Sequence, residues 1–338
     1  MKTSRTLFIA LLLFITPIFS QGEGGTFFLA SYNVENLFDT INDPTKNDEQ
    51  FLPSDSSQWN TEKYTTKLNH LAQVIDSMNN GWGPDVLGLA EVENKAVVDD
   101  LVAHLNNGKK YEVVHFESPD GRGIDCALIF NTRIFKFVAS DTLGVNLPNG
   151  WPTRSILHAA LTTPRGTLYH FFVNHWPSRS GGQEKSEINR VTAGARLKLK
   201  TDELLSKDPN TNILIMGDMN DEPLDKSIVE ALGALGFNCD SLSGLAQDAL
   251  YNLSLEKKLK GEGSYKYRGN WNMLDQMIAS GNVLKKLYLC GSFGIFNPEF
   301  IQQKGGNYEG ASLPTFGGRR YFGGYSDHFA VYAIFHLD

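Results

Sequence analysis

Short apolar runs that each adjoin a cluster of acidic, amide or imidazole side chains dominate the pattern of this 338-residue chain. Four runs end in such a cluster and a fifth begins with one: FFLASYNVEN, VLGLAEVEN, YHFFVNHWPSR, NILIMGDMND and YSDHFAVYAIF. Short runs that are apolar on both faces are typical of buried strands. Such strands would deliver their polar groups to one rim of a sheet, where hard oxygen ligands suit Mg²⁺, Mn²⁺ or Ca²⁺ better than zinc.

The rest of the hydrophobic periodicity predicts a mixed α/β fold. Helical spacing is clearest over 68–78, a second helix is expected over 183–206 and a weaker one over 224–235, whereas the turn-rich segment 40–59 is typical of a surface loop. Strands are expected at 27–32, 86–89, 111–116, 126–130, 156–161, 168–173, 213–216, 274–279 and 329–335. Two packed sheets with helices outside would bury so many apolar strands. Because polar clusters from both ends of the chain must meet, we expect one domain over 26–338.

The N-terminus has the order of a secretory signal. Lys2 and Arg5 precede an apolar stretch over 7–19, which is followed by small and polar residues. That stretch is too short for a comfortable membrane span, so we expect a signal peptide over 1–20. The mature protein would then be secreted or periplasmic, with no stable membrane insertion.

Charge and cysteine content narrow the function classes. The net charge of −7 would become −9 if Lys2 and Arg5 left with the signal, which weakens but does not exclude a nuclease, because a transient substrate needs only a local cationic strip. Export permits disulfides. Cys126 lies in an apolar run and is expected in the core, whereas Cys239 and Cys290 could pair, although sequence does not show that their side chains meet.

Several polar clusters offer the groups that phosphodiester hydrolysis requires, which are a metal, an activated water and ligands for the phosphate oxygens. Glu91 would project from a strand end toward a cation, with Asn33 and Glu35 beside it. Asp218 could accept the proton of the attacking water, and Asn220 points the same way along extended chain. The alternative is structural: a surface glutamate, a turn-capping asparagine and an Asx-turn.

The remaining polar groups fit phosphate binding. His175 follows a strand close to Arg179, and Arg154 could bind phosphate oxygens bidentately. Asp275 interrupts an apolar stretch and would need a partner, which His328, beside Asp327, could supply. The structural alternatives are a hydrogen-bonded surface histidine, a solvated arginine and an unrelated salt bridge.

Seven motifs in this order resemble the endonuclease/exonuclease/phosphatase superfamily: SYNVEN, GLAEVEN, RGIDCALIFN, NHWPSRSGG, GDMNDEP, LDQMIAS and YSDHFAV. The resemblance spans residues 26–337 and includes deoxyribonuclease I-like, secreted bacterial-type members. It implies a four-layer α/β/β/α sandwich of two mostly antiparallel sheets flanked by helices. It also implies an essential divalent metal, Mg²⁺ with Mn²⁺ or Ca²⁺ as alternatives.

The resemblance further implies roles for individual residues. Metal binding falls to Glu91, supported by Asn33, Glu35 and Asp327. Catalysis falls to Asp218, which activates or positions water that Asn220 orients, to His328 paired with Asp275 as base or phosphate ligand, and to His175 as acid or phosphate binder, with Asp125 as its partner. Substrate contacts fall to Arg154, Asn174 and Arg179.

The substrate class stays open because members of this superfamily share a core and differ in loops. Arg319 and Arg320 lie among glycines and aromatic residues and could contact a nucleic-acid backbone. The first hypothesis is therefore a secreted monomeric endonuclease acting on DNA or RNA. The alternatives are a phospholipid or small-molecule phosphoesterase, and a non-catalytic binding protein on the same fold.

Overall fold

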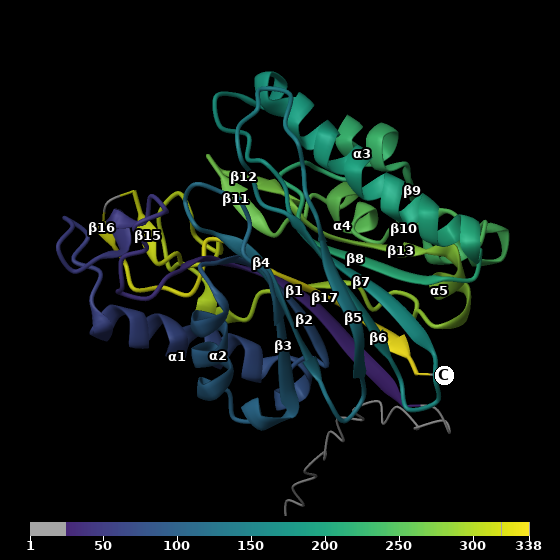
Figure 1. Cartoon of the computed structure of the whole chain (residues 1–338), viewed down its shortest axis with the longest axis horizontal. Helices are drawn as coiled ribbons and strands as arrows, with labels where there is room; N and C mark the ends of the chain where they lie inside the picture. The colour runs from purple at the N-terminus through teal and green to yellow at the C-terminus, as the bar shows by residue number, and fades with distance from the viewer. Residues whose placement is uncertain (1–24, 319, 338) are drawn as a thin grey trace, which may run out of the picture.

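Two large β-sheets packed face to face, with helices on their outer faces, form the protein (Figure 1). The computed structural model describes residues 25–318 and 320–337. The predicted four-layer α/β/β/α sandwich is confirmed. The predicted signal peptide over 1–20 lies outside the described residues, and no helix within them is long and apolar enough to cross a membrane.

The first sheet has six strands, and its centre is the parallel pair β1–β2. The other neighbouring strands in this sheet are antiparallel. In spatial order the strands are β14 (Gly294–Phe296), β17 (Ala330–His336), β1 (Thr26–Leu37), β2 (Val86–Val92), β4 (Asp125–Asn131) and β3 (Tyr111–His115).

The second sheet has seven strands, and its centre is the parallel pair β7–β8. In spatial order they are β5 (Lys136–Leu143), β6 (Ile156–Thr162), β7 (Leu168–His175), β8 (Asn212–Asp218), β13 (Asp275–Ser280), β10 (Leu250–Asn252) and β9 (Ala234–Gly236). Two small hairpins stand apart: β11 (Tyr265–Tyr267) with β12 (Asn270–Asn272), and β15 (Phe316–Gly317) with β16 (Arg320–Tyr321).

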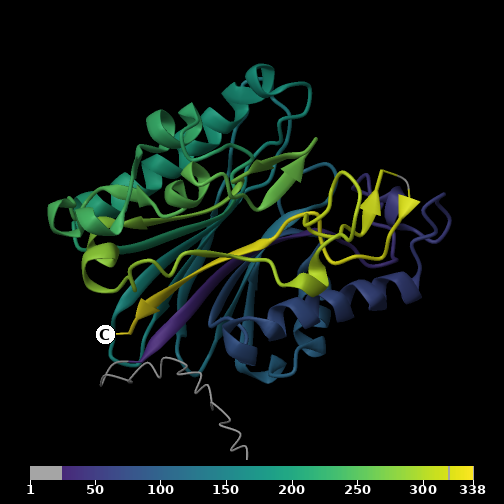
Figure 2. The same cartoon turned by 180° about the vertical axis from the view of Figure 1, so that it is seen from behind.

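Three apolar cores hold these layers together. The central core fills the space between the sheets and includes Phe27, Leu128 and Phe171. Helices α1 (Thr61–Ser77) and α2 (Lys95–His104) pack on the outer face of the first sheet, and α3 (Gln183–Lys207) packs on that of the second, so the helical layers lie on opposite sides (Figure 2). The short helices α4 (Leu255–Leu259) and α5 (Gly281–Lys286) lie near β10 and β13.

Most of the predicted elements are present, and the exceptions have physical causes. The helix predicted over 224–235 is wrong: a single π-helical segment, Ser227–Leu232, ends at Gly233 with φ 78°, and strand β9 follows. Strand β5 was not predicted because it is a mostly exposed edge strand without an apolar run. Helix α2 was also missed, since only Val97, Val98 and Leu101 are buried along it.

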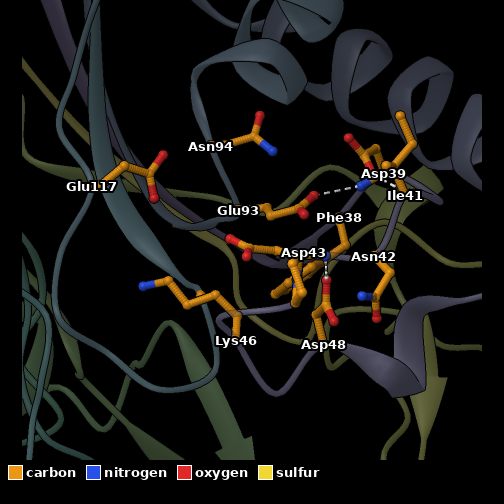
Figure 3. Close-up of a pocket in the computed structure, with 12 residues that line it drawn as sticks. Phe38, Asp39, Ile41, Asn42, Asp43, Lys46, Asp48, Glu93, Asn94 and Glu117 are labelled. Carbon is orange, nitrogen blue, oxygen red and sulfur yellow. Dashed lines mark hydrogen bonds between the residues drawn. The ribbon is translucent and has the colours of Figure 1, made fainter.

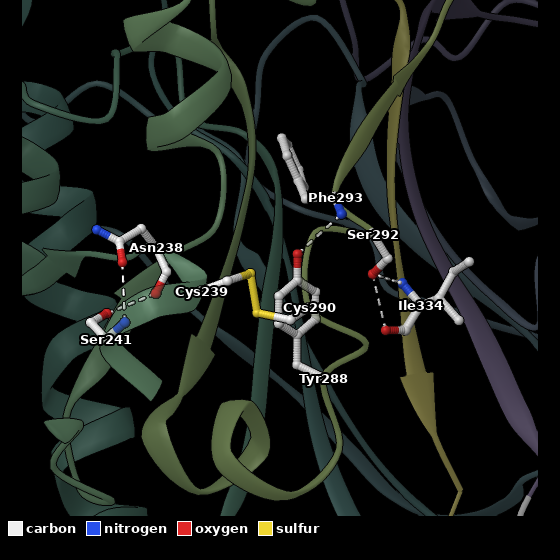
Figure 4. The surroundings of a disulfide bond; sticks show 8 residues. All are labelled: Asn238, Cys239, Ser241, Tyr288, Cys290, Ser292, Phe293 and Ile334. Carbon is white, nitrogen blue, oxygen red and sulfur yellow. Dashed lines mark hydrogen bonds between the residues drawn. A yellow bond between two sulfur atoms is a disulfide. The ribbon is translucent and has the colours of Figure 1, made fainter. Parts of the chain in front are cut away.

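A disulfide joins Cys239 to Cys290, which lie 51 residues apart in sequence with 5.8 Å between their Cα atoms (Figure 4). It links the segment after β9 to the segment before β14, beside the central core. The pairing that the sequence left open is therefore present. Cys126 is buried with a free thiol, as expected for a core residue.

Replacing Cys239 and Cys290 together with serine should lower the free energy of unfolding by about 2–4 kcal/mol, because the link restricts the unfolded chain. Urea unfolding of both proteins, with and without dithiothreitol, measures this difference. Dithiothreitol should destabilise the wild type and leave the double variant unchanged. Equal stability of the two oxidised proteins would contradict the prediction.

Candidate functional site

A cavity of about 390 Å³ opens at the rim where both sheets end. Polar strand ends from the two sheets reach it: Glu91 from β2, His175 from β7, Asp218 from β8, and Asp327 with His328 before β17. The full lining consists of Glu91, Arg122, His175, Ser178, Arg179, Ser180, Asp218, Asn220, Tyr265, Tyr267, Asn272, Leu274, Asp327 and His328.

Strand register brings the central residues together. Asp218 is aligned with His175 on the parallel strand β7 and with Asp275 on the antiparallel strand β13. The glycine before Asp218 is required here, because a Cβ on Gly217 would lie 2.0 Å from the carbonyl oxygen of Asn174. Its φ of 136° also favours glycine. The Gly-Asp pair in the GDMND motif thus allows β8 to approach β7 and places the carboxylate at the rim.

Asn33 holds two carboxylates in place. Its Oδ1 accepts the backbone N–H of Glu35 at 3.0 Å, which directs Nδ2 toward Glu91 Oε1 at 3.3 Å and Asp218 Oδ2 at 3.1 Å. Glu91 Oε2 also accepts the backbone N–H of Asn36 at 3.0 Å. Asn33 therefore positions the acids instead of offering an oxygen to a metal, which corrects the role predicted for it.

Asp275 and His328 form the pair that the sequence predicted. Asp275 is fully buried, and its Oδ2 lies 2.7 Å from His328 Nδ1 and accepts the Ser264 hydroxyl at 2.6 Å. Burial alone would lower the pKa of His328, but the charges of Asp275 and Asp327 outweigh it and raise that pKa well above 6.5. The imidazole is thus an oriented cation whose Nε2 lies 4.0 Å from Asp218 Oδ2.

His175 has the opposite character. Burial, followed by the charges of Arg154 and Arg122, holds its pKa well below 6.5, so its imidazole is neutral. Nε2 lies 3.6 Å from Glu91 Oε1 and 3.8 Å from Asp218 Oδ2. The site thus combines one neutral and one charged imidazole.

The partner predicted for His175 is wrong. Asp125 shares a face of β4 with Ala127, which packs in the outer, helical core, whereas Cys126 faces the central core. Oδ1 of Asp125 accepts the backbone N–H of Ser118 at 2.9 Å. Among the described residues, none forms a hydrogen bond with Nδ1 of His175.

Asp218 and Asn220 lie together at the cavity wall. Burial raises the pKa of Asp218 to about 6, with the Asp275 charge adding to this and the His328 charge opposing it. The backbone N–H of Asn220 donates to Asp218 Oδ1 at 2.8 Å, and its side-chain amide donates to the Trp176 carbonyl at 3.0 Å. Asp218 can accept a proton from water once it is ionised.

Two residues predicted to bind substrate are used inside the fold instead. The buried Arg154 guanidinium donates to the carbonyls of His175 and Trp176 at 3.2 and 2.6 Å and pairs with Asp120 at 3.1 Å. Asn174 is fully buried and donates to the Phe172 and Met216 carbonyls. The side chains of Arg154 and Asn174 therefore bind backbone carbonyls at the end of β7 and beside it. Neither residue lines the cavity.

Glu35 turns away from the cavity because β1 bulges between Asn33 and Leu37, with positive φ at Glu35 and Asn36. Its carboxylate accepts the backbone N–H groups of Thr315 and Phe316 at 2.6 and 3.0 Å. Glu35, which the resemblance implies as support for the metal site, instead anchors the start of β15.

Arg320, one of the two adjacent arginines predicted to contact substrate, does not reach the site. Arg320 in β16 lies over the Phe322 ring at 5.2 Å and does not line the cavity. Its hairpin packs on the loop near Trp59 through Phe316, with ring centroids 5.7 Å apart. Arg319 lies outside the described residues.

The cavity lining includes one of the arginines predicted to contact substrate and three residues that were not predicted. Arg179 does line the cavity, but its guanidinium pairs with Asp221 and Asp225 at 3.3 and 2.8 Å. Sequence reasoning missed Arg122, which follows the turn signal Asp-Gly, and the alternating Tyr265 and Tyr267 just before the LDQMIAS motif. The Asp-Gly turn and the alternating tyrosines predict a loop and a hairpin, but they do not show which way these segments fold relative to the cavity.

The acid set fits a hard divalent cation. Carboxylates of Glu91, Asp218 and Asp327 line the same cavity. Mg²⁺ binds through one or two carboxylates and keeps several waters, so it does not need a closed protein cage. Glu91 is the best placed of the three, because Asn33 and the Asn36 backbone fix its orientation.

A family model described as the endonuclease/exonuclease/phosphatase family matches residues 28–337. The chain belongs to this family. The activities in the family name are all hydrolyses of phosphoesters, which makes phosphoester hydrolysis the reaction class. No curated protein sequence matches the chain.

Solved structures of the same fold cover almost the whole chain. The truncated TDP2 of Caenorhabditis elegans has a TM-score of 0.57 at 16% identity, covering 92% of this chain and 97% of its own. The human Nocturnin catalytic domain has a TM-score of 0.53 at 16% identity, covering 93% and 95%. A mannosyl-6-phosphatase of Bacteroides thetaiotaomicron has a TM-score of 0.54 at 16% identity, covering 91% and 99%.

A second cavity, of about 330 Å³, is strongly acidic but differs in character (Figure 3). Glu93 and Asp48 there accept backbone N–H groups of Asp39 and Asp43, both at 2.8 Å. Burial raises the pKa of Glu93 to about 8, and the charges of Asp39, Asp48 and Glu117 add to the shift. Glu93 is thus protonated in the folded protein at neutral pH.

Glu93→Gln should make stability less dependent on pH. The folded protein holds the Glu93 proton up to about pH 8, whereas the unfolded chain releases it near 4.5, so ionisation costs stability as pH rises between these values. Glutamine cannot ionise and keeps an acceptor for the Asp39 N–H. Urea unfolding from pH 4.5 to 8 should show the variant gaining stability relative to wild type as pH rises. A parallel pH dependence of the two would contradict this; Glu112→Gln, at an exposed site, is the control.

Proposed function

We propose that the protein is an exported, divalent-metal-dependent phosphoesterase that cleaves compact phosphoesters such as nucleotides or sugar phosphates. The observation that carries this proposal is the cavity in which Glu91, Asp218 and Asp327 face the imidazoles of His175 and His328. Acids for a cation and oriented imidazoles for phosphate are the groups that this reaction needs.

Each residue has a role that follows from its surroundings. Glu91 would hold Mg²⁺, which when bound neutralises charge on the phosphate oxygens. The cationic His328, fixed by Asp275, and the neutral His175 donate Nε2–H groups to those oxygens. Asp218 accepts the proton of the attacking water, and Asn220 holds the Asp218 carboxylate through its backbone N–H.

The distribution of charge favours a compact substrate. The nuclease hypothesis depended on a cationic strip, but Arg154 is buried, Arg320 lies outside the cavity, and Arg179 is paired with two acids. Arg122 is about half exposed and pairs at 3.5 Å with one acid, Asp120, which Arg154 also contacts, so it keeps more charge for a substrate than Arg179 does. Tyr265, which stacks on the His328 ring with centroids 4.6 Å apart, and Tyr267 line the same cavity and bring aromatic surface to it for a base or a sugar.

Cleavage of single-stranded nucleic acid is the second candidate, favoured by the same tyrosines, since bases stack on aromatic side chains. Solved structures of this fold include one of each kind. One is a zebrafish TDP2 in complex with a single-stranded DNA product, and another is a mannosyl-6-phosphatase. Export is supported by the Cys239–Cys290 disulfide, which an oxidising compartment preserves.

The test is turnover of matched substrates by the mature protein with Mg²⁺ or with EDTA. The panel contains nucleoside monophosphates, hexose phosphates, a bis-aryl phosphodiester, short single-stranded DNA, RNA, plasmid DNA and sphingomyelin. We expect Mg²⁺-dependent release from the compact substrates, with Glu91→Gln about a hundredfold slower or more. Glu62→Gln, at an exposed position on α1, is the matched control.

The outcomes separate the hypotheses. Faster cleavage of plasmid DNA or RNA than of any compact substrate would favour the nuclease and overturn the compact-substrate proposal. Hydrolysis that survives EDTA, or a Glu91→Gln variant as active as wild type, would overturn the metal-dependent site. Circular dichroism of each variant establishes that it is folded.

A further inference from the structure

Three potential metal ligands gather on the outer face of the first sheet. One ligand atom each from His115, Glu117 and Asp125 lies within 4.8 Å of the other two. His115 ends β3, opposite Ala127 of β4, so Glu117 and Asp125 extend the same face of this hairpin two residues further. None of the three lines the cavity that contains Glu91 and His328.

Two of these ligand atoms are buried at ion-pair distance from each other but without a hydrogen bond. Asp125 Oδ2 and His115 Nε2 lie 3.4 Å apart, on side chains exposed by 1% and 3%. Neither atom has a hydrogen-bond partner within residues 25–318 and 320–337. Native proteins rarely leave buried polar atoms without a hydrogen bond, so two such atoms facing each other indicate a binding site for an ion.

The charges around these two atoms favour a cation as the bound ion. The ligand atoms of Glu117 and Asp125 lie within 4.8 Å of each other, so two carboxylates share a small space here. The nearby Lys46 does not resolve this, because its ammonium donates to the carbonyls of Ser118 and Asp120 at 2.8 and 3.0 Å. The cluster therefore joins one imidazole and two carboxylates around a space without a committed positive charge.

We propose that His115, Glu117 and Asp125 bind a Zn²⁺ ion, with water as the fourth ligand. Two ligands about 2.1 Å from zinc in tetrahedral geometry lie about 3.4 Å apart, which matches the separation of His115 Nε2 and Asp125 Oδ2. Glu117 is exposed, which leaves an entry path. An imidazole ligand also suits zinc better than Mg²⁺, unlike the oxygen donors of the catalytic cavity.

The adjacent acidic cavity of Figure 3 is a weaker candidate, although Glu117 also lines it. Its other acids Asp39, Asp43, Asp48 and Glu93 each already accept a backbone N–H. One buried oxygen there, Asp48 Oδ1, is also without a hydrogen bond, but the three-residue cluster has two such atoms, and they face each other at a ligand separation.

Zinc here would fix the mouth of the β3–β4 hairpin. The loop that leaves His115 and returns at Asp125 carries Asp120, which pairs with Arg154, and Arg122, which lines the catalytic cavity. The zinc site would thus stabilise the loop that places Arg122, without contributing a group to the cavity.

The test uses the mature, disulfide-bonded protein in millimolar Mg²⁺, which occupies the hard-oxygen site. Elemental analysis after dialysis against micromolar zinc should give one zinc per chain in wild type. His115→Gln and Asp125→Asn should each weaken zinc affinity at least tenfold, since changes in outer-shell partners alone cost about 10–100-fold. His104→Gln, a histidine at the end of α2, is the matched control and should retain zinc.

Thermal unfolding supplies an independent readout. Zinc should raise the melting temperature of wild type, of His104→Gln and of the catalytic variant Glu91→Gln, but not that of Asp125→Asn. Loss of zinc in Glu91→Gln would place the ion in the catalytic cavity and overturn the proposal. Absence of bound zinc in folded wild type, or equal retention by both cluster variants, would also overturn it.

Discussion

Buried charge is the constraint that organises this site. Asp275 is fully buried, and a buried carboxylate is costly unless it is paired and hydrogen-bonded. His328 and the Ser264 hydroxyl meet that requirement, and the pairing fixes both the direction of the imidazole and its charge. Asp218 lies on the neighbouring strand β8 and His175 on β7 beyond it, so the same cation influences the groups that would handle water and phosphate.

The fold supplies this arrangement through the parallel strand pair at the centre of each large sheet. In each sheet the central pair, β1–β2 or β7–β8, runs in one direction and ends at the shared rim. The chain there departs from regular strand geometry: β1 bulges after Asn33, and Glu91 and Asn220 have positive φ. Such backbone is common at functional sites, where strained positions are held by the surrounding structure.

Much of the fold and the centre of the site could be predicted from sequence, because both depend on local patterns. Apolar runs that end in polar groups located β1, β2, β7 and β8, and Glu91, His175 and Asp218 follow from their ends. His328 was found from the polar group that precedes the run of β17. The need of a buried Asp275 for a partner made His328 a candidate, the resemblance implied the same pair, and the pairing is present.

The site residues that were mispredicted are those whose positions depend on contacts between distant parts of the chain. The bulge in β1 turned Glu35 away, and strand alternation put Asp125 on the helical face. Arg154 and Asn174 satisfy buried carbonyls that no local pattern reveals. Arg122, Tyr265 and Tyr267 reach the cavity from a loop and a hairpin whose direction depends on tertiary packing.

The central claim, that Asp275 keeps His328 cationic and oriented, is tested most directly by nitrogen-15 NMR of the imidazoles in metal-free protein. In wild type, His328 should keep both ring protons well above pH 6.5, and in Asp275→Asn it should lose one at clearly lower pH. A His328 that is neutral at pH 6.5 in wild type, or that titrates identically in the two proteins, would contradict the account.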